Sequence, residues 1–295
     1  MEDLILLELT TLISIPSPSG DEAEILDYLE SRLISWGYST EHQIAGQHHN
    51  LVIPGKGVPF AISAHVDTVP PLDHPAPYHP RIEGGFVFGR GSADCKGGIA
   101  ALLGALEKFA RSRGANNLGP TVAFSVDEEE GGSGSEALAS TLALEGAIVI
   151  EPTELCVGIA EAGLLEYAVK VPGVPAHGGA FDEGISAVKQ AAKLISALET
   201  HPAFQRVHPL IGKGGFNVPY IAGGEKQLTV ASWLELKLDV RILPGDDIPE
   251  IRQAVENELD RIGADWKLED VSPPFQLTGK EAVVGLISSA YARAL

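Results

Sequence analysis

The sequence predicts an α/β protein, with a mainly parallel sheet flanked by helices and a second, smaller α+β domain. In the first half of the chain, short apolar runs alternate with helical patterns, as in a parallel sheet covered on both faces. After Gly163 the predicted order becomes β-α-β-β-α-β, which is the order of a ferredoxin-like sandwich. A chain of 295 residues is long enough for two such domains.

Two helices are predicted before the first strand. Residues 3–13 have a helical pattern that ends at the proline-rich turn SIPSPSG. Ser19, with Glu22 three residues later, resembles a capping box that starts a helix over about 21–36, and Gly37 ends this helix.

Strands then alternate with helices up to residue 150. Short apolar runs bounded by turn residues predict buried strands, and longer stretches with one apolar face predict helices. In chain order we expect strands at 51–53 and 60–65, a helix over 97–111, a strand at 121–126, a short helix near 134–143 and a strand at 147–150.

The second half follows a different order. We expect a strand at 165–171, a helix over 185–199, strands at 216–222 and 228–242, a helix over 248–262, a strand near 265–271 and a helix-like pattern over 275–295. This order places a first domain at 1–163, an inserted domain at 164–272 and the start of a return to the first domain at 273–295.

Composition argues against several classes of protein. Forty acidic and 21 basic residues give a net charge of −19, which disfavours sequence-independent binding to nucleic acid or to anionic lipid. Two cysteines are too few for a disulfide scaffold or a thiolate zinc site. Glu8 interrupts the first apolar run and no basic segment precedes it, so we expect no signal peptide. No uncharged run approaches 18 residues, so we expect no membrane span and a cytoplasmic protein.

Acidic and histidine residues follow the strands of the first half. The carboxyl ends of parallel strands form the crevice in which ligands bind, so residues placed there are expected to meet at one edge of the sheet. These residues are His65 and Asp67 in HVDTVP, Asp94 in GRGSADCKGG, the run Asp127–Glu130 after the strand at 121–126, and Glu151 in EPTEL.

These residue types suit a metal site. His65 and Asp67 point to the same side of an extended chain, where the carboxylate can accept the second N–H of the imidazole and fix its tautomer. Aspartate, glutamate and histidine suit zinc, cobalt or manganese, and carboxylates can bridge two metal ions. Each residue alone is more simply explained as a loop charge or a helix cap, but the whole set favours a metal site.

The motifs HVDTVP, GRGSADCKGG, VDEEEGGSGS and EPTEL together resemble metal-dependent amidohydrolases. This family includes acetylornithine deacetylase, succinyl-diaminopimelate desuccinylase, aminoacylase and glutamate carboxypeptidase. VPGVPAHGGAFDEGISAV and LDVRILPGDD resemble its dimerisation domain, so the likeness covers nearly the whole chain and is strongest to the acetylornithine deacetylase branch. It implies a zinc-aminopeptidase-like catalytic domain, an inserted ferredoxin-like dimerisation domain, a homodimer and a place in arginine biosynthesis.

The resemblance also implies a role for each residue of the cluster. His65, Asp94, Glu129 and Glu151 would be ligands of two divalent ions, zinc or cobalt, with Asp94 bridging them. Asp67 would orient His65. Glu128 would be the general base, which takes a proton from water and returns it to the leaving amine. We expect Glu130 to be exposed to solvent.

Two residues of the second half resemble substrate-contacting residues of the family. His177 in AHGG would reach the active site of the partner subunit and stabilise the oxyanion. Arg241 in DVR would bind a substrate carboxylate. The alternatives are a loop histidine with ordinary hydrogen bonds and an ion pair of Arg241 with Asp239. Cys95, beside Asp94, is expected to pack rather than to bind.

The sequence departs from the family pattern at two places. In the family, a histidine near the C-terminus completes the second metal site, but the last histidine here is His208, in the small domain. We therefore expect a truncated catalytic domain and an incomplete second metal site. The family often has a substrate-contacting asparagine where this chain has Leu228, which cannot form that hydrogen bond.

The expected activity is metal-dependent hydrolysis of the amide bond in a small N-acyl amino acid, with N-acetylornithine as the first choice. Desuccinylation, deacylation of an N-acyl-lysine and a carboxypeptidase activity use the same residues and stay open. An alternative of another class is a catalytically impaired homologue that retains the fold and part of the metal site. GxGxxG, P-loop, HExxH and GxSxG motifs are absent.

Overall fold

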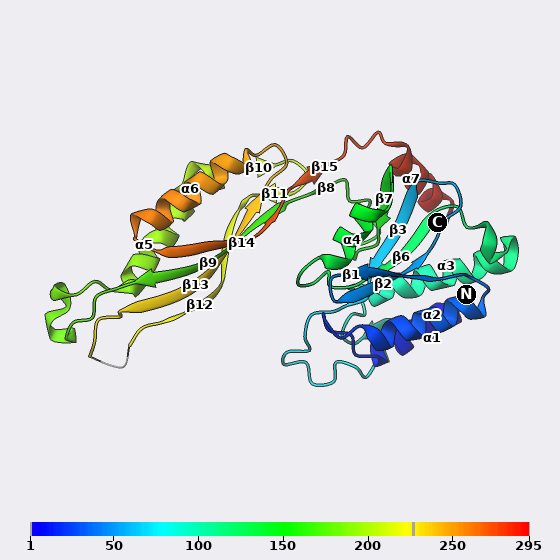
Figure 1. Cartoon of the computed structure of the whole chain (residues 1–295), viewed down its shortest axis with the longest axis horizontal. Coiled ribbons are helices and arrows are strands. Elements are labelled where there is room, and N and C mark those ends of the chain that lie inside the picture. The colour runs from blue at the N-terminus through cyan, green and yellow to red at the C-terminus, as the bar shows by residue number, and fades with distance from the viewer. Residues whose placement is uncertain (1, 226–227, 295) are drawn as a thin grey trace. The chain divides into compact units, whose positions relative to one another are not determined.

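The computed structural model in Figure 1 describes residues 2–225 and 228–294. The residues outside this description are Met1, Lys226, Gln227 and Leu295. Leu295 is the last position of the helix-like pattern predicted over 275–295. The chain divides into two compact units, Met1–Leu155 and Cys156–Leu295. The predicted fold class is confirmed, because an α/β unit is followed by an α+β unit.

The first unit is built on a five-stranded sheet with the order β1-β2-β6-β3-β7. The parallel part consists of β3, which pairs with β6 on one side and β7 on the other, while β2 is antiparallel to both β6 and β1. The sheet is therefore mixed, with its parallel strands at one side. Its strands are β1 (Glu41–Ala45), β2 (His48–Ile53), β3 (Phe60–His65), β6 (Thr121–Ser125) and β7 (Gly146–Val149).

Helices cover both faces of this sheet. One face packs Leu51 and Phe124 against three helices in the main core, and the opposite face packs Val52 and Ala123 against Leu138 of α4. Neighbouring strand residues face opposite sides, which explains how the short runs LVI and VAF serve both layers. The helices are α1 (Glu2–Ser14), α2 (Ala23–Ser35), α3 (Lys96–Arg113), η1 (Ala115–Asn117) and α4 (Ser133–Thr141), and a separate hairpin is formed by β4 (Arg81–Glu83) and β5 (Phe86–Phe88).

The start of α2 differs from its prediction. Glu22 is the N-cap residue but makes no capping hydrogen bond with its side chain, and Ser19 donates its hydroxyl proton to Asp67 Oδ2 over 2.7 Å. The predicted capping box is therefore wrong. Both side chains point away from the helix and toward the carboxyl edge of the sheet, because they find buried acceptors and donors there.

The second unit contains a four-stranded antiparallel sheet with the order β12-β13-β9-β14. Numbered along the chain, this is the 2-3-1-4 order of a ferredoxin-like sandwich, as predicted. Alternate residues of β9, among them Leu165, Tyr167 and Val169, are buried under α5 and α6. The elements are β9 (Gly163–Pro172), α5 (Ala187–Thr200), β12 (Gly215–Gly223), β13 (Trp233–Ile242), α6 (Ile248–Arg261) and β14 (Asp265–Ser272).

Short elements complete the second unit. β8 pairs with β15, so the second unit begins before its first long strand, β9. The assignment of 273–295 to a return to the first domain stays a prediction. Within the described ranges, no helix combines the length and the hydrophobicity needed to cross a bilayer. The short elements are β8 (Ala160–Glu161), η2 (Gly178–Glu183), η3 (Pro202–Phe204), β10 (Val207–His208), β11 (Gly212–Lys213), β15 (Phe275–Gln276) and α7 (Ala282–Ala294).

A buried charge joins α1 to α2. Glu8, which interrupts the apolar run of α1, is fully buried and accepts hydrogen bonds from Arg32 Nε at 2.9 Å and from the Tyr28 hydroxyl. Burial, together with the hydrogen bond to Glu8, raises the pKa of Tyr28 to about 12. The carboxylate is tolerated inside the protein because both of its oxygens have partners.

We expect Glu8→Ala to lower the free energy of unfolding by about 2 to 3 kcal/mol, because Arg32 and Tyr28 lose their partner. Urea denaturation followed by circular dichroism measures this loss. Glu24→Ala, at an exposed position of α2, is the control and should change the free energy of unfolding by less than about 0.5 kcal/mol. Equal losses in the two variants would contradict the prediction.

Candidate metal centre

The carboxyl end of β3 carries a buried histidine and a buried aspartate. His65 is the last residue of β3 and is 2% exposed, and Asp67, two residues later, is fully buried. His65 Nδ1 lies 3.3 Å from Asp67 Oδ1. The two side chains face each other as the sequence predicts, and the apolar strand FAISAH holds them at the centre of the parallel part of the sheet.

Asp67 is the most heavily hydrogen-bonded side chain of the cluster. It accepts hydrogen bonds from Ser19 Oγ at 2.7 Å and from the backbone N–H groups of Glu128 at 3.1 Å and Glu129 at 3.0 Å. Burial would raise the pKa of Asp67, but His65 and these donors lower it below its ordinary value. The Asp67 carboxylate is therefore negatively charged at neutral pH and faces Nδ1 of His65.

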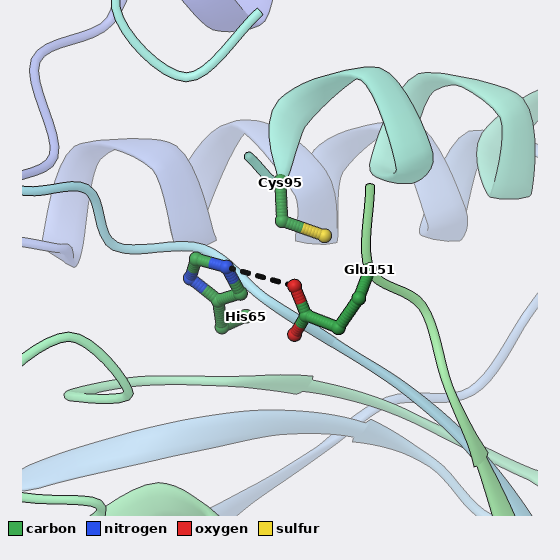
Figure 2. A group of neighbouring side chains, drawn as sticks. All are labelled: His65, Cys95 and Glu151. Carbon is green, nitrogen blue, oxygen red and sulfur yellow. Dashed lines mark ion pairs between the residues drawn. The ribbon is translucent and has the colours of Figure 1, made fainter. Parts of the chain in front are cut away.

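The other nitrogen of His65 faces acidic residues from two further segments. His65 Nε2 lies 2.9 Å from Asp94 Oδ1, just before α3, and 3.9 Å from Glu151 Oε2, just after β7. Figure 2 shows the imidazole and the Glu151 carboxylate pointing toward each other. Burial alone would lower the pKa of His65, but Asp67, Asp94 and Glu151 raise it to about 10.

Candidate ligand atoms converge on His65 in two groups. His65, Asp94 and Glu129 each offer an atom within 4.8 Å of the others, and so do His65, Cys95 and Glu151. All four residues predicted as ligands therefore lie at one place, which is the carboxyl edge of the sheet. Their role as ligands stays a prediction.

Cys95 belongs to the second group by distance but is a hydrogen-bond donor. Its thiol is buried and donates to the carbonyl oxygen of Ile150 over 2.9 Å. Burial and the charges of Glu151 and Asp94 raise the pKa of Cys95 to about 12. A protonated thiol is a poor metal ligand, so the chemistry of the site is that of imidazole and carboxylate.

The carboxylates repel one another. Burial, followed by repulsion from Asp94, Glu128 and Glu129, raises the pKa of Glu151 to about 7, and the pKa values of Glu128 and Glu129 are raised for the same reasons. A divalent cation among these oxygens would remove the repulsion and accept the Nε2 lone pair of a neutral His65. The donor set and its charge thus fit a divalent metal of the zinc or cobalt type.

Sequence reasoning missed Lys96, which lies one residue beyond Cys95. Lys96 is fully buried at the start of α3 and donates its Nζ proton to the carbonyl oxygen of Ile15 over 2.7 Å. Burial lowers the pKa of Lys96 to about 8. The contact ties the chain beside Asp94 to the turn that follows α1. A lysine in a glycine-rich loop gives no sequence signal for such a contact.

His177 and Arg241 lie in the second unit. His177 is exposed, and its Nδ1 accepts the N–H of Gly179 over 3.1 Å. Arg241 Nη2 lies 2.9 Å from Asp239 Oδ2, which is the ion pair considered as the alternative for this residue. The roles of both residues stay predictions.

Two further positions of the second unit bear on the predicted departures. Leu228 is 75% exposed and has a left-handed backbone conformation with φ of 74°, which asparagine adopts more readily than leucine. His208 Nε2 lies 3.1 Å from Gln276 Oε1, a contact within the same unit.

Comparison with known proteins identifies relatives over most of the chain. The sequence profile of Peptidase family M20/M25/M40 matches residues 61–294. A succinyl-diaminopimelate desuccinylase of Corynebacterium glutamicum is 28% identical over 294 residues, which cover 94% of this chain and 78% of that protein. An acetylornithine deacetylase of Proteus mirabilis is 27% identical over 283 residues, which cover 86% of this chain and 71% of that protein.

Solved structures share the fold. A tripeptidase from Staphylococcus aureus has a TM-score of 0.75 at 23% identity, and the match covers 100% of this chain and 83% of that one. The YXEP protein of Bacillus subtilis, described as a dinuclear metal-binding peptidase from the M20 family, has a TM-score of 0.66 at 16% identity and covers 98% of this chain and 79% of that one. These likenesses establish the common fold.

Zinc binding at pH 7 is expected to release about one to two protons per chain, because only deprotonated groups bind a metal. His65, with a pKa of about 10, is protonated in the metal-free protein at this pH, and Glu151, with a pKa of about 7, is half protonated. Zinc affinity should therefore rise as the pH increases from about 6 to 8.

Isothermal titration calorimetry in buffers of different ionisation enthalpy measures both the released protons and the number of zinc ions bound. His42→Gln is the control variant, since His42 lies on β1 beside Glu30 and outside the cluster. It should release as many protons as the wild-type protein. Zinc binding without proton release at pH 7 would contradict the pKa values of the cluster.

Proposed function

The chain belongs to peptidase family M20/M25/M40, and from this membership we propose that it hydrolyses the amide bond of a small N-acyl amino acid at a centre of two zinc or cobalt ions. The observation that carries the proposal is the convergence of His65, Asp94, Glu129 and Glu151 at the carboxyl edge of the sheet. N-acetylornithine is the first candidate substrate. The relatives named acetylornithine deacetylase and succinyl-diaminopimelate desuccinylase support this substrate class.

His65, Asp94, Glu129 and Glu151 would hold the metal ions, with Asp94 between them. The name of the Bacillus subtilis structure, a dinuclear metal-binding peptidase, supports two ions rather than one. Bound there, the ions would polarise the amide carbonyl and lower the pKa of water. Asp67 would keep His65 in the tautomer that presents Nε2, because its carboxylate faces Nδ1.

Glu128 is proposed as the general base. Its backbone is fixed on Asp67 beside the proposed ligand Glu129, and its side chain is exposed at the rim of the cluster. Partial desolvation, together with repulsion from Glu129, Asp67 and Asp94, raises the pKa of Glu128. A raised pKa makes the carboxylate a better proton acceptor, and the proton it takes from water can then pass to the leaving amine.

The second unit is proposed to supply substrate contacts. The exposed Arg241 guanidinium would bind the substrate carboxylate, and the exposed His177 would stabilise the oxyanion in the site of a partner subunit. Both assignments rest on the resemblance of DVR and AHGG to the family. A homodimer in the cytoplasm is part of the same proposal.

A competing proposal is a catalytically impaired homologue that binds a single metal ion. In this proposal His65, Asp94, Glu129 and Glu151 hold one ion rather than two. The two proposals differ in zinc stoichiometry. One tight zinc site without turnover would support the impaired homologue, whereas two tight sites would contradict it.

We expect the zinc-loaded or cobalt-loaded chain to release acetate from N-acetylornithine, and Glu128→Gln to lower kcat about 10²- to 10⁴-fold without weakening zinc binding. Parallel assays use N-succinyl-diaminopimelate, an N-acyl-lysine and a tripeptide to decide among the branches. Glu130→Gln is the matched control, because Glu130 is exposed on the same loop. Wild-type activity in Glu128→Gln would remove Glu128 as the base.

We expect Arg241→Met to raise KM about tenfold or more with little change in kcat, because the substrate carboxylate loses a charged partner. Asp239→Asn is the comparison, since it breaks the 2.9 Å ion pair but keeps the guanidinium. If Arg241 binds substrate, only Arg241→Met raises KM. If its role is the ion pair alone, both variants leave KM unchanged.

A further inference from the structure

The loop that carries Glu128 and Glu129 is fixed through its backbone. The N–H of Asp127 donates to Glu22 Oε1 over 3.2 Å, and the N–H groups of Glu128 and Glu129 donate to the two oxygens of Asp67. Three consecutive backbone donors are thus held by two carboxylates, and both of these are buried, with exposures of 2% for Glu22 and 0% for Asp67. Charge-assisted hydrogen bonds in such surroundings hold a backbone tightly.

Glu22 is buried although it stands at the start of a helix. Its side chain makes no capping bond to α2. Oε1 accepts the N–H of Gly20 over 3.0 Å as well as that of Asp127, and Oε2 lies 3.7 Å from His48 Nδ1. A buried carboxylate is costly unless it has partners. Of these groups only the Asp127 N–H belongs to the loop, whereas Gly20 lies in the turn before α2 and His48 lies at the start of β2.

The loop itself has little room for another shape. Asp127 has a left-handed backbone with φ of 59°, which is uncommon for a residue other than glycine. Its carboxylate accepts the N–H of Gly131 over 3.1 Å and the hydroxyl of Ser133 over 2.7 Å. A Cβ at Gly131 would lie 2.6 Å from Asp127 Oδ2, so a side chain there would displace the Asp127 carboxylate. Because the loop is compact, the contact of Glu22 with its first residue sets the position of the residues that follow.

Ser19 provides a second contact from the same turn, through its 2.7 Å hydrogen bond to Asp67 Oδ2. The turn from Ser19 to Glu22 therefore supplies one of the two carboxylates that hold the loop and donates a hydrogen bond to the other. We propose that Glu22 and Ser19 are positioning residues for the general base. They fix the backbone position of Glu128 and of its neighbour Glu129, and thereby the direction of both side chains. This inference rests on the proposed function, in which Glu128 is the base.

The expected size of the effect follows from what such contacts do elsewhere. Removing a residue that orients a ligand or catalytic group typically costs about 10- to 100-fold in activity or metal affinity, and a displacement of about 1 Å has a similar effect on rate. Because neither residue is proposed to touch the substrate, the loss should fall on kcat rather than on KM.

The test compares Glu22→Ala with Glu22→Gln in the full chain loaded with zinc. Alanine leaves the N–H of Asp127 without an acceptor, whereas glutamine keeps a carbonyl oxygen in place of Oε1. We expect Glu22→Ala to lower kcat about 10- to 100-fold and zinc affinity about tenfold, with KM changed less than about threefold. Glu22→Gln should restore most of both losses.

Ser19→Ala tests the second contact at a half-buried position, where we expect the loss of one hydroxyl to leave the fold intact. We expect kcat to fall about three- to tenfold, because Asp67 loses one of its donors. Ser31→Ala is the matched control, since that hydroxyl donates to the carbonyl oxygen of Tyr28 within α2. It should match the wild-type protein in kcat and zinc affinity.

Glu8→Ala separates positioning from stability, because it removes a buried carboxylate from α1 without touching the loop. It should lower the melting temperature and leave kcat and zinc affinity of the folded protein unchanged. The inference is overturned if Glu22→Ala behaves like Glu8→Ala, or if Glu22→Ala does not fold and Ser19→Ala equals wild type. If the wild-type protein hydrolyses none of the substrates, the proposed function fails, and the zinc affinities of the same variants still decide the inference.

Discussion

The first unit depends on how it accommodates the charge of Asp67. A fully buried carboxylate is unfavourable unless donors surround it, and Asp67 collects them from three places: Ser19, the loop at Glu128 and Glu129, and the facing ring of His65. The hydrogen bonds to Asp67 hold together the turn after α1, the end of β3 and the loop after β6. The candidate site is therefore a consequence of solvating a buried charge with protein groups.

The acidic side chains that surround His65 and Asp67 repel one another when no cation is bound. Asp94 and Glu129 form one candidate group with His65, and Glu151 faces the same imidazole. Burial, together with repulsion from Asp94, Glu128 and Glu129, raises the pKa of Glu151 to about 7. Such an arrangement lowers stability and is kept where charge must be concentrated for a ligand. The two sets of residues have separate roles. Asp67 and its hydrogen-bond donors fix the geometry of the site, whereas Asp94, Glu129 and Glu151 provide affinity for a metal.

The sequence predicts the buried parts of this structure better than the exposed parts. The run FAISAH matches β3 residue for residue, because a strand buried in a parallel sheet must be apolar. The strand EHQIA was not expected, since β1 is polar and mostly exposed. The residues at the strand ends could be predicted from the parallel order alone, but Ser19 and Glu22 could not. Their partners lie 48 and 105 residues away, and local pattern favours a helix cap.

The two parallel pairings of β3 also determine when the cluster can exist. His65 lies at the end of β3, whereas Glu129 follows β6 and Glu151 follows β7, so the cluster requires both parallel pairings of β3. Closing such long loops is slow compared with forming helices or hairpins. The full set of acidic side chains therefore exists only when both pairings have formed, and metal uptake would report that a newly made chain has completed them.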